Sequence, residues 1–349
     1  MKTKAYATHH AKDDLKPFVI DRRSVLEDDV LIDILYCGIC HSDIHTARSE
    51  WGPANYPVVP GHEIIGRVMQ VGEKVLNFKV GDLVGVGCMV DSCQHCNSCH
   101  DGLEQYCENK ATYTYNSVDK ISGGFTYGGY SDKIVVKESF VLKVPEHIDA
   151  AAAAPLLCAG ITTWSPLRHW KVKAGDRVGV IGLGGLGHMA IKFAHAMGAQ
   201  VVMITTSPKK GEDAQKLGAS EVLISTDAAA MKAQLKTFDF LINTIPVGHD
   251  VNPYLNLLKR DATMVMVGAI EPLTATNSSL LVGSRRSIAG SLIGGIKETQ
   301  EMLDFCGVHN IVSDIELIPI QDVNTAYQRM LASDVKYRFV IDMKSLKES

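Results

Sequence analysis

Hydrophobic residues along the first 145 positions fall into short runs that are typical of β-strands. Glycines separate these runs, as expected of tight turns and of the corners of a small barrel. The pattern predicts a strongly bent β-barrel with loops. Its expected strands are 30–36, 64–71, 82–86 and 133–136.

The pattern changes after Pro145, where an alanine run at 150–154 opens a helical stretch. Buried-type runs then alternate with segments of helical period, which predicts an α/β fold with a doubly wound parallel sheet. The expected elements are strands 177–181, 201–205, 238–243 and 263–267 and the helix 186–197, followed by helices 297–305 and 322–331 and a last strand 338–342.

Composition narrows the class of protein. The chain has 349 residues, enough for two domains, with 46% hydrophobic and 21% charged residues, which excludes a disordered chain. A net charge of -4 leaves no basic surplus for a phosphate backbone and argues against nucleic acid as a partner. The longest apolar stretch, 150–161, is shorter than the roughly 20 residues of a membrane span. No signal core follows the N-terminal lysines, so we expect a cytoplasmic protein without a membrane partner.

A glycine-rich turn fits the pattern G-x-G-x-x-G between an expected strand and an expected helix. Gly182 permits the tight turn, Gly184 allows a pyrophosphate to approach the backbone, and Gly187 lets helix and strand pack closely. With Gly185 and Leu186, these residues open a helix whose free N–H groups can bind an anion. A plain strand-to-helix turn is the alternative.

The end of the next strand bears on the choice of cofactor. NAD sites usually have an Asp or Glu there, which binds the ribose 2′-hydroxyl. This chain has Thr205, Thr206 and Ser207 instead, followed by Lys209 and Lys210. Hydroxyls and lysines suit a 2′-phosphate, so we expect NADP. The alternative is that Ser207 only caps a helix that begins at a proline and that the lysines are solvated.

Four of the nine cysteines lie within fifteen residues, with the spacing C-x2-C-x2-C-x7-C. Without a secretory signal this clustering favours a metal over disulfides. Four thiolates suit a closed, structural zinc site, formed by Cys93, Cys96, Cys99 and Cys107. An iron–sulfur cluster is the rival, but there the fourth cysteine usually follows after three residues and precedes a proline.

A second, open metal site is possible at Cys40, His62 and Cys158. Two thiolates and one imidazole leave a fourth position for water or substrate, as in catalytic zinc sites. The three residues are scattered, however, and a lone buried cysteine is more often part of a core than a ligand. From the residues alone, both interpretations stay open.

The motifs together resemble zinc-dependent medium-chain alcohol dehydrogenases, specifically the cinnamyl alcohol dehydrogenase group. The resemblance covers essentially the whole chain and includes the segments 40–45, 61–63, 155–160, 291–295 and 337–342, besides the glycine turn and the four-cysteine lobe. It implies a GroES-like β-barrel catalytic domain over 1–152, a Rossmann cofactor-binding domain over 153–294, and a return of 295–349 to the catalytic domain. It also implies two zinc ions per chain, NADP and a homodimer.

The resemblance further implies roles for single residues. Cys40, His62 and Cys158 match the catalytic zinc ligands, and Glu63 matches a carboxylate that can approach the metal. Asp43 matches an acid that orients the ligand histidine, which makes physical sense. The remaining matches are Ser42 and His45 for a proton relay through the cofactor ribose, Thr205, Thr206, Ser207 and Lys210 for the 2′-phosphate, Arg338 near the cofactor phosphates, and Trp51, Cys88, Leu292 and Ile293 for the substrate pocket.

These matches predict hydride transfer between NADP(H) and a primary alcohol or aldehyde, with aromatic and medium aliphatic aldehydes as expected substrates. One departure concerns Tyr113, which stands near the place where plant members have a pocket tryptophan. An NAD-linked polyol or alcohol dehydrogenase of the same fold is the nearest alternative. A zinc-free quinone reductase of the same fold is disfavoured, because it would lack the Cys40, His62 and Cys158 trio. A zinc-lobe binding protein without activity is disfavoured, because it should show a basic face.

Overall fold

The computed structural model describes residues 1–268 and 271–347, which form two compact units. Unit 1 comprises Met1–Cys158 and Gly294–Ser349, and unit 2 comprises Ala159–Ile293. The division falls directly after Cys158, so the three scattered candidate metal ligands all belong to unit 1.

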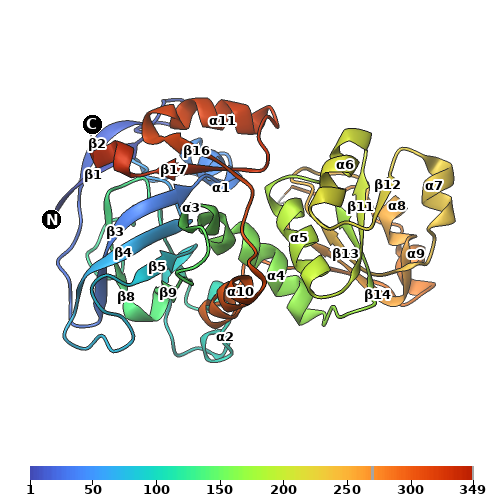
Figure 1. Cartoon of the computed structure of the whole chain (residues 1–349), viewed down its shortest axis with the longest axis horizontal. Helices are drawn as coiled ribbons and strands as arrows, with labels where there is room; N and C mark the ends of the chain where they lie inside the picture. Colours follow the sequence, from blue (N-terminus) through green and yellow to red (C-terminus); the bar gives the residue numbers. More distant parts are fainter. Residues whose placement is uncertain (269–270, 348–349) are drawn as a thin grey trace. The chain divides into compact units, whose positions relative to one another are not determined.

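Unit 1 contains a seven-stranded mixed sheet (Figure 1). Its strand order is β16 (Ile315–Pro319), β17 (Arg338–Asp342), β3 (Asp29–Gly38), β4 (Ile64–Val71), β5 (Leu83–Val86) and β9 (Leu142–Lys143), and β8 (Lys133–Lys137) pairs with β3. Val30, Ile32 and Ile34 of β3 are fully buried at alternate positions, which explains why this segment forms a strand with one face in the core.

The C-terminal segment completes this sheet. Strand β17 coincides with the predicted 338–342 and pairs with the end of β3, Val340 opposite Gly38 and Ile341 opposite Cys37. This pairing explains why β3 extends two residues beyond the predicted 30–36: the partner strand lies 300 residues further along the chain and leaves no local signal.

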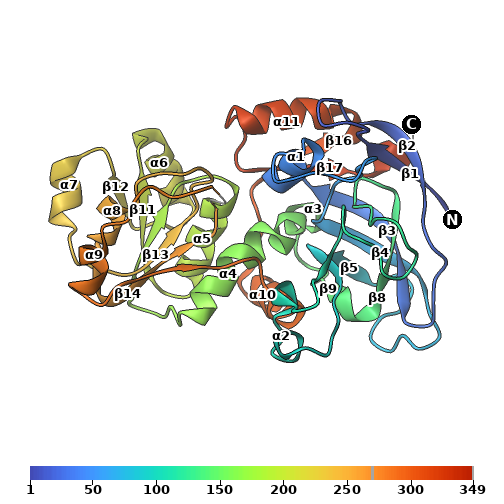
Figure 2. The same cartoon turned by 180° about the vertical axis from the view of Figure 1, so that it is seen from behind.

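The other elements of unit 1 surround the sheet (Figure 2). Two short antiparallel pairs are β1 (Lys2–Ala7) with β2 (Lys16–Asp21) and β6 (Met89–Asp91) with β7 (Thr112–Tyr113). The helices are α1 (His41–Ala47), α2 (Asn97–His100), α3 (Ala150–Ala153), α10 (Ile296–His309), α11 (Val323–Leu331) and α12 (Lys344–Lys347), and short 3-10 turns are η1 (Glu104–Tyr106), η2 (Glu138–Phe140), η3 (Ala154–Leu157) and η4 (Ile320–Asp322).

Unit 2 is the predicted doubly wound parallel sheet, with α5 and α6 labelled beside it in Figure 1. The strand order is β12 (Glu221–Ile224), β11 (Gln200–Thr205), β10 (Arg177–Ile181), β13 (Phe238–Asn243), β14 (Leu258–Met266) and β15 (Ser287–Gly290), and the helices are α4 (Ala159–His169), α5 (Gly185–Ala196), α6 (Pro208–Lys216), α7 (Ala228–Ala233), α8 (Asn252–Leu255) and α9 (Ser278–Val282). Numbered within the unit, the order is 3-2-1-4-5-6, the dinucleotide-binding arrangement, whose crevice opens between the first and fourth strands.

Two predicted boundaries in the described residues differ from the structure by four residues or more, and the other boundaries differ by no more than two. Strand β14 begins at Leu258, five residues before the predicted start, because the exposed polar residues Lys259, Arg260 and Asp261 hide its first half from a hydrophobicity pattern. Helix α10 continues to His309, four residues beyond the prediction, and ends at Asn310 in the left-handed conformation. No single described helix has the length and mean hydropathy of a membrane span. The helical segments 150–157 and 159–169 reach that length and hydropathy only when taken together, and they are bent by 56° where they meet.

Candidate active site and metal centres

Four potential metal ligands converge in unit 1 from three distant segments. Cys40 caps the start of α1 just after β3, His62 and Glu63 immediately precede β4, and Cys158 follows η3. Their ligand atoms all lie within 4.8 Å of one another, and Cys40 Sγ is 3.9 Å from Cys158 Sγ. The fold therefore brings together the residues that the sequence left scattered.

Asp43 fixes the orientation of the His62 imidazole. Its Oδ1 lies 3.0 Å from His62 Nδ1 and 3.0 Å from the Gly61 backbone N–H, while Oδ2 accepts from Cys40 N at 2.9 Å. An ionised carboxylate only accepts hydrogen bonds, so Nδ1 donates and Nε2 is left with the lone pair that a metal needs. One fully buried carboxylate thus holds both Cys40 and His62 in place.

Glu63 and Arg338 form a buried ion pair beside the thiols. Burial raises the pKa of Glu63 to about 7, against the opposing effect of the Arg338 charge. Glu63 Oε2 has no hydrogen-bond partner in the described structure although it is buried, so this oxygen has a free lone pair within the cluster. A carboxylate oxygen in this position can approach a bound metal.

The position of Arg338 was predicted only through the resemblance, which expects it near the cofactor phosphates. In the structure its guanidinium pairs with Glu63. This ion pair is neither at the surface nor on an edge strand, because β17 lies between β16 and β3 and Arg338 is only 4% exposed.

The donor set of this cluster suits zinc. Two thiols, one imidazole with its lone pair directed inward and one unpartnered carboxylate oxygen are the atoms that zinc binds in open, catalytic sites. The hydrogen bond from Cys158 lowers the pKa of the Cys40 thiol well below its ordinary value, which favours the thiolate form that a metal requires. We call Cys40, His62, Glu63 and Cys158 the open cluster.

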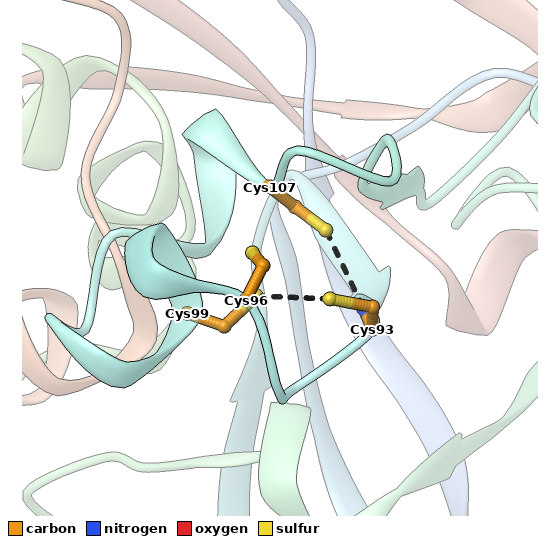
Figure 3. Close-up of side chains that lie close together, drawn as sticks. All are labelled: Cys93, Cys96, Cys99 and Cys107. Carbon is orange, nitrogen blue, oxygen red and sulfur yellow. Dashed lines mark hydrogen bonds between the residues drawn. The ribbon is translucent and has the colours of Figure 1, made fainter.

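Four further cysteines form a second cluster in unit 1, and Figure 3 shows the side chains of Cys93, Cys96, Cys99 and Cys107 close together. All four sulfur atoms lie within 4.8 Å of one another, and Cys93 Sγ is 3.9 Å from Cys99 Sγ. Backbone N–H groups of Cys93 and Glu108 donate to Cys107 Sγ and Cys96 Sγ, each at 3.4 Å. A tetrahedral zinc ion fits this closed set of thiols, which we call the lobe cluster.

The two residues assigned to the proton relay lie on α1, the helix whose N-cap is Cys40 of the open cluster. Ser42 Oγ lies 3.6 Å from Cys40 Sγ, within hydrogen-bond distance of the sulfur. The His45 imidazole contacts Glu50 through Nδ1 and stacks on the Trp51 ring, with the ring centroids 4.7 Å apart. Trp51, which the resemblance places in the substrate pocket, is half exposed and packs on His45.

The remaining pocket predictions have different surroundings. Cys88 Sγ donates to the Leu157 carbonyl at 3.7 Å, next to Cys158. Tyr113 is 40% exposed on β7, whereas the buried Tyr115 packs its ring 5.7 Å from the His62 ring. Tyr115 was missed because nothing in the local sequence distinguishes it from Tyr113.

In unit 2, Leu292 is 46% exposed and Ile293 is buried with a positive φ of 36°, a strained conformation for a β-branched residue.

The glycine-rich turn has the backbone that its sequence predicts. Gly182 has a positive φ of 92°, and a Cβ on Gly187 would lie 2.1 Å from the Gly182 carbonyl oxygen. At Gly184 an added Cβ would meet no atom within 4 Å, so the backbone there is open to a ligand. Gly185 and Leu186 then begin α5. The turn fits a pyrophosphate, which would contact the exposed N–H groups at the start of α5.

The end of β11 carries hydroxyls and amines and no acid. Thr205 is buried, whereas Thr206 and Lys210 are exposed. The Ser207 hydroxyl caps α6 by accepting from Lys210 N at 3.5 Å, as the alternative interpretation of this residue requires. Capping uses one lone pair of the hydroxyl and leaves its O–H able to donate to a phosphate.

Comparison with known proteins identifies the family. Residues 26–146 match the alcohol dehydrogenase GroES-like domain, and residues 185–307 match the zinc-binding dehydrogenase domain. The aldehyde reductase YahK of Escherichia coli is 56% identical over the whole of both chains. This chain belongs to the zinc-dependent medium-chain alcohol dehydrogenases.

Solved structures place this alcohol dehydrogenase in the cinnamyl alcohol dehydrogenase group. A cinnamyl alcohol dehydrogenase of Sorghum bicolor superimposes with a TM-score of 0.95 at 45% identity, covering 99% of this chain and 98% of the other. An enzyme of the same group from Helicobacter pylori, solved with NADP(H), gives a TM-score of 0.92 at 44% identity, covering 99% of each chain. Membership of this family decides between two pairs of alternatives. The lobe cluster is a zinc site and not an iron–sulfur cluster, and the chain is an oxidoreductase and not a zinc-lobe binding protein.

Proposed function

We propose that this dehydrogenase reduces aromatic and medium aliphatic aldehydes with NADPH, using the open cluster as its catalytic centre. The observation that carries the proposal is that Cys40, His62 and Cys158 converge beside the unpartnered Oε2 of Glu63. A closed structural site would not need this extra carboxylate, whereas an open one exchanges ligands during turnover.

The residues of the chain would act as follows. Cys40, His62 and Cys158 would hold zinc, which as a Lewis acid polarises a carbonyl oxygen when it is bound. Asp43 keeps His62 Nδ1 protonated and its ring oriented. Ser42 holds a hydroxyl proton beside Cys40, and His45 exchanges protons with solvent at the surface of the unit. Glu63 and Arg338 neutralise each other in the buried interior.

The cofactor preference rests on the end of β11. Thr206, Ser207 and Lys210 offer donors and a positive charge for a 2′-phosphate, and no acid stands there to bind an unmodified ribose. The NADP(H)-bound relative from Helicobacter pylori supports the same preference. The NAD-linked polyol alternative would require an acid at this point of the chain. We assign cofactor binding to unit 2 and catalysis to unit 1, whose boundary after Cys158 lies six residues beyond the 152 that the resemblance implies, in a cytoplasmic homodimer.

A rate assay that follows loss of reduced-nicotinamide absorbance tests the proposal, with cinnamaldehyde paired with NADPH and, separately, with NADH. We expect turnover mainly with NADPH. Lys210→Glu should raise the KM for NADPH roughly tenfold and leave the KM for NADH unchanged. Lys216→Glu, at the other end of α6, is the matched control and should change neither value. Turnover mainly with NADH would contradict the phosphate assignment, and no turnover with either cofactor would contradict the substrate class.

A further inference from the structure

The segment that follows β13 borders the glycine-rich turn of unit 2. Strands β10 and β13 are parallel neighbours, with Ile181 opposite Asn243. Directly after that pair, the Thr244 hydroxyl donates to the Ile181 carbonyl at 2.9 Å and lies 3.1 Å from the Gly182 carbonyl oxygen. Because a dinucleotide binds at this crevice of a doubly wound sheet, the segment 244–249 leaves the sheet beside the expected cofactor site.

A side-chain hydrogen bond joins the end of β13 to the last residue of this segment. Asn243 Nδ2 lies 2.8 Å from His249 Nε2. Asn243 is fully buried, whereas His249 is half-buried and its ring lies edge-on to that of Tyr254 on α8, with the ring centroids 6.2 Å apart. The bond closes a loop whose middle residues, 246–248, are exposed. We call this hydrogen bond the Asn243–His249 latch.

The other partners of the two side chains fix the direction of this bond. The Ile245 N–H donates to Asn243 Oδ1 at 3.2 Å, so the amide nitrogen of Asn243 is the atom that faces the ring. His249 Nδ1 lies 2.8 Å from the Val247 carbonyl oxygen, which accepts and cannot donate. Nδ1 therefore carries a proton, and Nε2 of the neutral ring accepts from the Asn243 amide. An imidazolium would place two donors against each other and break the latch.

Two further hydrogen bonds connect the segment to an irregular stretch of the chain after β14. The Gly248 N–H donates to Glu271 Oε2 at 2.8 Å, and the Thr274 hydroxyl donates to the His249 carbonyl at 3.2 Å. Glu271 and Thr274 are both exposed. Exposed hydrogen bonds of this kind open readily, so the buried anchor at Asn243 decides how well the loop is ordered.

We propose that His249 and Asn243 are positioning residues for the dinucleotide, because the latch orders the loop beside the glycine-rich turn before the cofactor binds. The inference rests on the proposed function, in which unit 2 binds the cofactor. A loop ordered in advance loses less conformational freedom on binding, which tightens binding. The latch and the residues for the 2′-phosphate lie on opposite sides of β10, since the strand order is β11-β10-β13. The latch therefore has the same effect on NADPH and on NADH.

Dissociation constants measure this effect without turnover, through the change in reduced-nicotinamide fluorescence on binding. His249→Leu should raise the dissociation constants of NADPH and NADH by the same factor, roughly fivefold. His249→Gln should restore most of the affinity, because its side-chain carbonyl can accept from the Asn243 amide. His195→Leu removes an exposed imidazole from the far end of α5 and should change neither constant. A loss confined to NADPH, unchanged constants, or no rescue by His249→Gln would overturn the role of the latch.

The latch itself can be observed in the full chain without cofactor. ¹⁵N-histidine labelling, with His249→Leu to assign the signal, should show neutral His249 protonated at Nδ1. Asn243→Asp replaces the amide donor with an acceptor, so the ring should then carry protons on both nitrogens near neutral pH. A neutral wild-type ring protonated at Nε2 would overturn the inference even if the chain binds NADPH normally.

The same titrations separate this inference from the proposed function. Lys210→Glu should weaken the binding of NADPH and spare that of NADH, whereas His249→Leu should weaken both. A wild-type chain that prefers NADPH, with the affinity of His249→Leu unchanged, would contradict the role of the latch alone. A wild-type chain that binds neither cofactor would contradict the proposed function and the role of the latch together.

Discussion

The two cysteine clusters of unit 1 are built in opposite ways. The lobe cluster takes its four ligands from fifteen consecutive residues, and two of the four cysteines are only partly buried. This segment has hardly any regular structure beyond the single turns α2 and η1. The open cluster takes its ligands from three segments that span positions 40 to 158, and the strands of the barrel hold them. The difference indicates that metal orders the lobe, whereas the fold pre-forms the open cluster.

This contrast predicts that a ligand of the open cluster can be lost without loss of the fold. Cys158→Ser should lower the rate of aldehyde reduction by about a thousandfold or more, because a site without its second thiolate holds zinc poorly and positions it wrongly. The far-ultraviolet circular dichroism and the melting temperature should change little. Metal analysis should find one zinc per chain where the wild-type chain has two.

Cys306→Ser is the matched control for that variant. Cys306 is also a fully buried thiol of unit 1, but its neighbour is Met302 Sδ at 3.7 Å and it lies outside both clusters. It should keep both zinc ions and nearly full activity. Retention of two zinc ions by Cys158→Ser would contradict the assignment of the open cluster.

The same contrast predicts the reverse outcome in the lobe. Cys96→Ser should cost several kcal/mol of stability, since the loop between Cys93 and Cys107 has little besides its metal to order it. The open cluster should keep its zinc, and the fraction of molecules that stays folded should keep its turnover rate. Urea unfolding with parallel metal analysis checks both statements. A loss of activity that exceeds the loss of folded protein would show that the lobe serves catalysis directly.

The two clusters also differ in how far the sequence could predict them. The spacing of Cys93 to Cys107 is a complete local signal, because all four ligands fall within one short loop. Cys40, His62 and Cys158 carry no such signal, and only the resemblance made them ligands before the fold brought them together. The pairing of Arg338 with Glu63, of Glu50 with His45 and of Tyr115 with His62 depends on side-chain packing that no spacing encodes.

The fold was more predictable than the site for a related reason. Strands such as β4, β10, β13 and β17 are short and mostly apolar, so their bounds follow from local pattern alone. The first half of β14 and the end of β3 were missed because partner strands, not local hydrophobicity, define them.

We expect a smaller effect on zinc binding from a substitution of Asp43, which supports the open cluster without itself binding the metal. Asp43→Asn should weaken zinc at the open cluster roughly ten- to a hundredfold, since the amide holds His62 less firmly and lacks the negative charge. The lobe zinc should be unaffected. Competition with a chelator, followed for both ions, measures the difference. Asp132→Asn, another buried acid of unit 1, is the control, and equal zinc loss in both variants would point to general destabilisation.

The smallest predicted effect concerns how the lobe is attached to the rest of unit 1. The N-cap of α10 is Gly295, which has no side chain to cap the helix, and Glu104 Oε2 from the lobe accepts the hydrogen bond of Ile296 N at 3.0 Å. A Cβ on Gly295 would lie 1.8 Å from the Gly102 carbonyl oxygen, so glycine is what permits this close approach. Glu104→Ala should therefore cost about 1 kcal/mol, the usual contribution of a helix cap.

Hydrogen exchange distinguishes this cap from a general loss of stability. In Glu104→Ala the amides of the first turn of α10 should exchange faster, while both zinc ions and the turnover rate stay unchanged. Glu108→Ala removes an exposed carboxylate from the same lobe and should leave α10 protected. If Glu104→Ala released the lobe zinc, the metal and the helix cap would depend on each other. The lobe would then be ordered partly by the barrel, and the contrast between a metal-ordered and a fold-ordered cluster would be weaker than the two ligand sets suggest.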